Sequence, residues 1–253
     1  MAVTAVSYAL AKGLTGFIPT PWGVGQLLVG IFVPAFLAVV SDTISVAVGA
    51  GIGTFMGDVF FLAPSGATNP ALSLIAGVPA NFFGFLLFGW FVKKYPTWRG
   101  FVTATVSFVT LGNLIAATAV VLFGAIVFTP LVTLLPQFYF AGVIFGLTLF
   151  WSVTMVPIII VVVPILVQAV KPLASRSPVV SNIPSWGESG RRTALIVSAL
   201  LSLVLVSLAI LYLPGAFGLA SFPVNATDAA LLAIALIIVG PPVSLIAKAR
   251  MSR

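Results

Sequence analysis

Residues 49–72 read "GAGIGTFMGDVFFLAPSGATNPAL" and place one carboxylate, Asp58, in an otherwise apolar run. Gly49, Gly53 and Gly57 precede it at intervals of four residues, which puts them on one face of a helix. Overlapping GxxxG units of this kind allow the backbone of a neighbouring membrane helix to approach closely. We therefore expect residues 43–63 to span a membrane and to pack through this glycine face against another helix.

The composition of the whole chain agrees with a membrane protein. Of its 253 residues, 61% are hydrophobic and 6% are charged, whereas a soluble domain carries about 25% charged residues. Apolar runs of about 20 residues recur, which is the length that a helix needs to cross ~30 Å of hydrocarbon. Strand-type alternation is absent. The expected fold is an all-α, multi-pass protein of the cell membrane.

Apolar runs and their polar breaks predict about eight spans. A polar segment, residues 171–192, separates the first six from the last two. We expect a six-helix bundle over residues 1–170, a basic loop over 171–192, and a C-terminal two-helix transmembrane hairpin with a basic tail over 193–253. The predicted spans are 3–18, 24–40, 43–63, 71–92, 101–128, 139–168, 193–213 and 229–247.

The distribution of basic residues predicts the orientation. Ten of the eleven Lys and Arg residues fall in the connections that share one side of this eight-span arrangement, and Lys12 is the exception. Cytoplasmic loops of membrane proteins are enriched in Lys and Arg, so both termini are expected in the cytoplasm. The net charge of +7 is then an orientation signal, and nucleic acid is not expected as a partner.

Residue types that are absent narrow the chemistry. The chain has no Cys and no His, which removes thiolate nucleophiles, histidine zinc sites and Ser-His triads. Its four acids are Asp42, Asp58, Glu188 and Asp228. Asp42 and Asp58 are separated by about 24 Å on one predicted helix, too far to act as an aspartyl protease dyad. We expect no enzyme activity, no catalytic residues, no metal site and no cofactor.

Lys12 and Asp58 are the two ionisable residues within predicted spans rather than at their ends. Lys12 lies about 8 residues, or ~12 Å, from the outer end of its span, and Asp58 about 5 residues, or ~8 Å, from the outer end of its own. The flexible stem of a lysine covers that difference. We therefore expect the two side chains to share one outward-facing cavity and to pair. A purely structural ion pair between two helices fits the same pattern.

Other polar or amphipathic side chains fall at similar depth. Asn81 in "GVPANFFG" and Asn113 in "TLGNLIAAT" are candidate ligand-binding residues, although each is also able to hydrogen-bond a neighbouring helix. Trp151 in "LFWSVT" falls in the middle of a span, whereas tryptophan prefers the membrane interface. Trp22, in the first predicted outer loop, is either a lid over the cavity or an interface anchor.

The first ~170 residues resemble the substrate-binding S-component of energy-coupling factor (ECF) vitamin transporters. The resemblance rests on the six-span block, on "AVGAGIGTFMGD", which is similar to the glycine-rich third span of that family, and on "NPAL" leading into "GVPANFFGFLLFG". Ala5, Ala9 and Gly13 resemble the small-residue strip with which that family docks on its transmembrane coupling subunit. The last two spans exceed the usual six of the family.

The resemblance implies a membrane-embedded capture protein for a small vitamin-like molecule. Lys12, Trp22, Asp58, Asn81, Asn113 and Trp151 are the expected substrate-binding residues. Uptake would need a transmembrane coupling subunit and ATPase subunits as partners, because the chain contains no GxxxxGK[ST] phosphate-binding loop. The alternative is a non-catalytic structural or accessory subunit of a larger membrane complex, since small-residue faces and few ionisable groups suit that role equally well.

Overall fold

The structure is a computed structural model, which describes residues 1–16, 26–127, 137–172 and residue 184. Within these residues the regular elements are all helices. The predicted seventh and eighth spans, the C-terminal hairpin, Trp22 and nearly all of the loop 171–192 lie outside the described residues. The first six predicted spans are each represented, so the structure addresses the bundle expected over residues 1–170.

The helical segments follow one another with short connections. Three of the long helices contain a π-helical segment. In each of them, the π segment and the α-helical elements directly next to it in the sequence form one continuous helix. The elements are α1 (Ala2–Thr15), the 3₁₀ turn η1 (Val29–Ile31), α2 (Phe32–Val40), α3 (Thr43–Gly57), the π segment η2 (Asp58–Leu62), α4 (Pro70–Leu72), the π segment η3 (Ser73–Gly77), α5 (Val78–Lys94), α6 (Trp98–Ala104), the π segment η4 (Thr105–Val109), α7 (Thr110–Val127) and α9 (Gln137–Val170).

Four of these helices are long and apolar enough to cross a membrane: Thr43–Leu62, Pro70–Lys94, Trp98–Phe123 and Val143–Val170. They coincide with the third to sixth predicted spans. The helices within the first two predicted spans are shorter. α1 has 14 residues, and η1 and α2 together form one shorter apolar helix, Val29–Val40. At 1.5 Å per residue, α1 extends over about 21 Å and is too short to cross ~30 Å by itself. The described part is therefore a membrane-embedded helical bundle.

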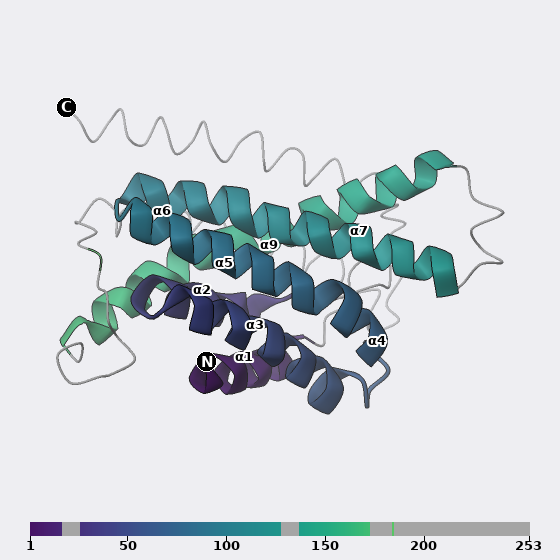
Figure 1. Ribbon diagram of the computed structural model, residues 1–253, viewed down its shortest axis with the longest axis horizontal. Helices are drawn as coiled ribbons and strands as arrows, with labels where there is room; N and C mark the ends of the chain where they lie inside the picture. The colour runs from purple at the N-terminus through teal and green to yellow at the C-terminus, as the bar shows by residue number, and fades with distance from the viewer. Residues whose placement is uncertain (17–25, 128–136, 173–183, 185–253) are drawn as a thin grey trace, which may run out of the picture.

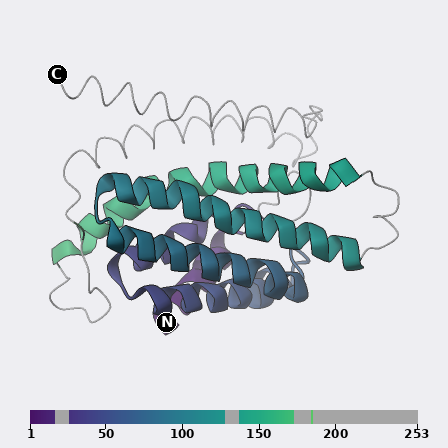
Figure 2. The same ribbon diagram turned by 45° about the horizontal axis from the view of Figure 1, so that its top comes forward.

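The long helices run side by side along the longest axis of the molecule, as Figures 1 and 2 show. α5 packs against both α3 and α7, α7 packs against α9, and α1 packs mainly against α3. The end of α5, the start of α6 and the end of α9 lie at the left in Figure 1. Because these helix ends carry or adjoin Lys93, Lys94, Arg99 and Lys171, we call this the basic end. The connection of residues 63–69 between η2 and α4 lies at the opposite end.

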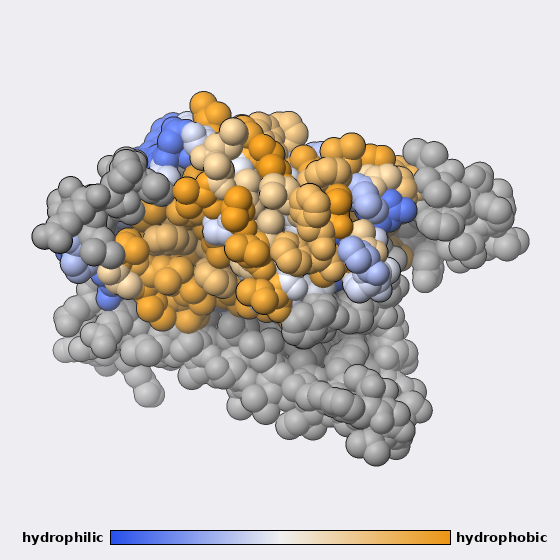
Figure 3. All heavy atoms as spheres, turned by 90° about the horizontal axis from the view of Figure 1, so that it is seen from below, coloured by the Kyte–Doolittle hydropathy of each residue, from blue (hydrophilic) through white to orange (hydrophobic). Residues whose placement is uncertain are grey.

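The surface of the bundle matches a lipid environment. Large apolar side chains such as Ile44, Phe60 and Phe145 are more than 60% exposed. On the face in Figure 3, apolar residues cover the middle of the described part, and hydrophilic residues gather toward its two ends. Apolar patches of this extent are unfavourable in water and favourable in hydrocarbon.

Side-chain caps fix where three of the helices begin. The Asp42 carboxylate accepts a hydrogen bond from the Ser45 N–H at 2.8 Å and starts α3. Asn69 and Thr97 cap α4 and α6 in the same way. Each cap satisfies a backbone N–H that has no partner within its helix. At the basic end, the Lys93 ammonium donates to the Ser41 carbonyl, which joins the end of α5 to the end of α2.

Candidate functional site

The glycine face of α3 packs closely against α1, and this contact lies beside the candidate site. A Cβ atom placed on Gly49 would lie 2.7 Å from the Thr4 Cβ, and one on Gly53 would lie 2.7 Å from the Ala5 carbonyl oxygen. These distances are shorter than any real Cβ contact. Gly49 contacts Thr4, Gly53 contacts Tyr8 and Gly57 contacts Lys12, so that both chains advance by four residues from one contact to the next. The two helices therefore run parallel. Gly49, Gly53 and Gly57 thus face α1 in the structure.

This contact uses the small-residue strip of α1, which corrects one expectation. Ala5 and Ala9 are 5% and 3% exposed and face α3 within the bundle. Gly13 faces the Phe61 ring, since a Cβ atom there would lie 2.5 Å from the Phe61 Cγ. Ala5 and Ala9 therefore pack against α3 of the same chain, and Gly13 packs against Phe61, rather than forming the exposed strip that the resemblance implies.

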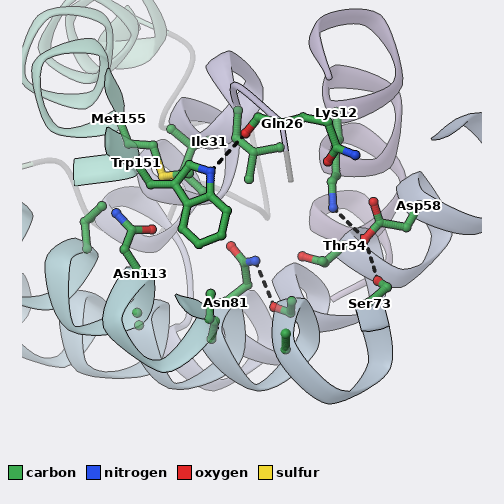
Figure 4. Close-up of a pocket in the computed structure, with 18 of the residues that line it drawn as sticks. Lys12, Gln26, Ile31, Thr54, Asp58, Ser73, Asn81, Asn113, Trp151 and Met155 are labelled. Atoms are coloured by element: carbon green, nitrogen blue, oxygen red, sulfur yellow. Dashed lines mark hydrogen bonds and ion pairs between the residues drawn. The ribbon is translucent and has the colours of Figure 1, made fainter. Parts of the chain in front are cut away.

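The close approach of α1 brings Lys12 to Asp58. The Lys12 stem crosses Gly57, where a Cβ atom would lie 3.1 Å from the Lys12 Cδ. The Lys12 Nζ lies 2.7 Å from the Asp58 Oδ2, and the two side chains are 5% and 4% exposed. Figure 4 shows Lys12 descending from α1 onto this carboxylate. The predicted pairing of these residues is confirmed.

A third residue completes this polar group. The Ser73 Oγ donates a hydrogen bond of 2.5 Å to the same oxygen, Asp58 Oδ2. The second oxygen, Asp58 Oδ1, is buried and has no hydrogen-bond partner. A carboxylate has about four acceptor positions, so Asp58 retains unused acceptor capacity inside the bundle. Sequence reasoning missed Ser73, because a lone serine in a span carries no distinctive signal.

Asn81 joins a neighbouring network. Its Oδ1 accepts a hydrogen bond of 3.2 Å from the Tyr8 hydroxyl, and its Nδ2 donates to the Gly77 carbonyl at 2.9 Å. Thr54, fully buried, points toward the same space in Figure 4 and donates to the Ala50 carbonyl at 2.8 Å. These bonds hold Asn81 and Thr54 in fixed orientations between α1, α3 and α5.

Trp151 and Asn113 approach from the other side of the bundle. The Trp151 Nε1 donates to the Gln26 carbonyl at 3.1 Å, and the Gln26 amide donates in turn to the Ala67 carbonyl. The Asn113 Nδ2 donates to the Ser152 Oγ at 3.2 Å, joining α7 to α9. Gln26 was not predicted, because a single uncharged glutamine at the start of the span 24–40 carries no distinctive signal.

These residues share one cavity of about 90 Å³. Five of the six predicted substrate-binding residues line it, and the sixth, Trp22, lies outside the described residues. Figure 4 shows the labelled side chains converging on this space from several helices. The predicted residues are Lys12, Asp58, Asn81, Asn113 and Trp151, and the other lining residues include Gln26, Ile31, Thr54, Thr68, Ser73, Ala80, Phe85, Phe108, Ala116 and Met155.

All three π segments contribute to the cavity wall. Asp58 comes from η2, Ser73, Ala76 and Gly77 come from η3, and Val109 comes from η4. A π segment shifts the backbone hydrogen bonds by one residue and often accompanies a functional site. Here the π segments change which side chains of the three long helices that contain α3, α5 and α7 face the interior. No sequence pattern predicted these segments.

The chemistry of the lining is that of a binding site. It combines one cation, one anion, amides and hydroxyls with aromatic and aliphatic walls, which is the usual make-up of a small-molecule site. The described residues contain no group of three or more His, Cys, Asp and Glu that could hold a metal ion. Comparison with family models, with curated proteins and with solved structures found no match for the chain.

Proposed function

We propose that the chain is a membrane-embedded binding protein that captures a small molecule in the cavity between α1, α3, α5, α7 and α9. The observation that supports this is the meeting of Lys12, Asp58, Asn81, Asn113 and Trp151 at one hollow, although they come from widely separated parts of the sequence. Scattered helix-to-helix contacts would not require a common space.

The finer proposal follows the resemblance to S-components. The captured molecule enters from the outer side and is a small vitamin-like compound, and uptake is energised by a separate coupling subunit and ATPase subunits. The cavity volume of about 90 Å³ is below the ~300–1,000 Å³ of sites for drug-sized ligands. The molecule is therefore compact, or the helices around the π segments separate to admit it.

One observation favours the alternative of an accessory subunit without a ligand. Lys12 and Asp58 pair with each other, and Asn81, Asn113 and Trp151 each hydrogen-bond another part of the protein. In that role the polar groups serve only to join helices, at about 0.6–2 kcal/mol for each hydrogen bond. The two proposals differ in whether the cavity has an occupant.

The test is the identification of a bound molecule. The full chain is purified from its native membrane in lipid nanodiscs and denatured, and the released compounds are identified by mass spectrometry. Capture predicts one non-lipid compound in stoichiometric amount, which is lost from the Ala116→Leu variant because the added side chain fills the cavity. Lipid alone, together with partner chains that remain bound, would support the accessory role and contradict capture.

A further inference from the structure

The electrostatic composition of the cavity restricts the charge of its ligand. Lys12 and Asp58 are the only ionisable residues among the described residues that line it, and they neutralise each other at 2.7 Å. Lys12 and Asp58 are both less than 6% exposed, so water screens them poorly. A ligand with a net charge would bring an uncompensated ion into this site, which is strongly unfavourable. An uncharged ligand leaves the ion pair intact.

The hydrogen-bonding groups restrict the polarity of the ligand. Several donors of the lining already have protein acceptors: the Trp151 indole, the Gln26 amide and the amides of Asn81 and Asn113. Among the buried side-chain nitrogen and oxygen atoms of the described residues, Asp58 Oδ1 is the one without a hydrogen-bond partner, so the polar group has an acceptor to offer. The terminal torsion of an aspartate is broad and nearly two-fold. A modest rotation of the carboxylate therefore offers a free acceptor position to the cavity.

The walls and the volume restrict the shape. Phe85, Phe108, Trp151 and Met155 line the cavity together with small residues such as Ala80 and Ala116. Aromatic and thioether groups favour flat, polarisable partners. The volume of about 90 Å³ lies below the ~150 Å³ of an engineered cavity that binds benzene. It therefore limits the ligand to about the size of a single ring, which enters as the walls move outward.

We infer that the ligand of this cavity is a compact ring compound that is uncharged at neutral pH and donates a hydrogen bond to Asp58. This inference rests on the proposed capture function and specifies the class of molecule that is captured. It also assigns Asp58 a second role, which is to accept a hydrogen bond from the ligand while it remains paired with Lys12.

Four matched probes test the inference. Benzamide is uncharged and carries an N–H donor, methyl benzoate is uncharged without a donor, benzoate is an anion and benzylamine is a cation at pH 7. Saturable binding of radiolabelled benzamide is measured on the full chain in nanodiscs, with empty nanodiscs as the blank for partition into lipid. The other three compounds are then used as competitors. Each is expected to displace benzamide at least about tenfold less well than unlabelled benzamide does.

Two variants separate charge from hydrogen bonding. The double variant Lys12→Met with Asp58→Leu removes both charges while roughly keeping volume, a replacement that buried ion pairs often tolerate. In it the advantage of benzamide over methyl benzoate should disappear, whereas benzoate and benzylamine should remain weak. Asp42→Asn, at the exposed cap of α3, is the matched control and should bind all four probes as the unaltered protein does.

The results distinguish this inference from the proposed function. If benzoate or benzylamine displaced benzamide as well as unlabelled benzamide does, the inference would be overturned, while capture of a charged molecule would stand. Absence of saturable benzamide binding up to about 10 mM would also overturn it. The capture function is judged separately by the co-purified compound: a charged compound would support capture and contradict the inference, and lipid alone would contradict both.

Discussion

Lys12 and Asp58, 46 residues apart in the sequence, meet at 2.7 Å because Gly57 has no side chain. A Cβ atom on residue 57 would lie 3.2 Å from the Lys12 Cβ and 3.4 Å from the Ala9 Cα. The glycine face of α3 and the ion pair are therefore parts of one arrangement. The glycines determine how closely α1 approaches, and this distance determines whether the lysine reaches the carboxylate.

The ion pair leads to the first prediction. Asp58→Leu should lower the free energy of unfolding by about 3–5 kcal/mol, because it leaves the Lys12 charge buried without a partner. Lys12→Met should have a similar effect, and the double variant should cost less than the sum of the two. Unfolding by a denaturing detergent in mixed micelles, followed by circular dichroism, measures these values. Arg99→Met, at an exposed site, should change the value by under about 0.5 kcal/mol. Additive effects of the two single variants would contradict a coupled pair.

The glycine face leads to the second prediction, which compares two positions on the same helix. Gly53→Ala should destabilise the protein by about 1–3 kcal/mol, because the added methyl group would collide with the Ala5 backbone at 2.7 Å. Gly51→Ala should be neutral or stabilise by up to about 1 kcal/mol, since its Cβ atom would lie 3.4 Å from Val78 and alanine favours helix. Equal effects at the two positions, in the same unfolding assay, would show that α1 does not pack on this face.

Some of this arrangement could be predicted from the sequence. The runs 43–63, 71–92, 101–128 and 139–168 correspond to the four membrane-length helices, since length and apolarity are direct requirements of the bilayer. The pairing of Lys12 with Asp58 followed from their similar depth, because an isolated charge is costly in hydrocarbon. The packing role of the glycines followed from their spacing of four.

Other features of the site could not be predicted from the sequence. Ser73 is one of many serines and threonines in the chain, and only the fold places its hydroxyl on Asp58. The π segments depend on a local shift of backbone hydrogen bonds, which residue types hardly reveal. The small residues of α1 were interpreted as a docking strip because a sequence pattern does not distinguish a partner in another chain from α3 of the same chain.

The cap of α3 leads to a prediction about pH. The hydrogen bond from the Ser45 N–H lowers the pKa of Asp42 below its ordinary value of 3.8. A group with a lowered folded-state pKa stabilises the protein above its unfolded pKa, and this contribution is lost as pH falls through the folded value. Asp42→Ala should therefore cost about 1 kcal/mol at neutral pH, and the difference should shrink only below pH 3.8.

The control for this prediction is Asp42→Asn, which caps the helix without titrating. The difference in unfolding free energy between Asp42→Asn and Asp42→Ala should stay constant over the same acidic range. If the unaltered protein and Asp42→Ala differed by the same amount below pH 3.8 as at neutral pH, the ionised carboxylate would not be the source of the stabilisation.

The indole of Trp151 leads to a fourth prediction. Trp151→Phe keeps an aromatic ring in the cavity wall but removes the donor that binds the Gln26 carbonyl at 3.1 Å. The loss should be about 1–3 kcal/mol in unfolding free energy, because the carbonyl is left without its partner in a buried position. Trp90→Phe, at a site that is 51% exposed, should cost under about 0.5 kcal/mol. A loss at Trp151 no larger than that at Trp90 would contradict a structural role for the indole N–H.

Thiol labelling tests most directly whether the polar residues share a hollow that water and ligands can reach. The chain has no Cys, so single cysteines are introduced at Asn81 and Asn113, which line the cavity, and at Phe83 and Leu114, which are exposed on the outer surface of the same helices. In nanodiscs methyl methanethiosulfonate, a small uncharged reagent that the electrostatics of the cavity do not exclude, reacts with thiolates, which form where water reaches the thiol and not in lipid. We predict labelling of Asn81→Cys and Asn113→Cys, and little at Phe83→Cys and Leu114→Cys. Unreactive cysteines at both cavity positions, or equal reactivity at all four, would contradict a shared cavity.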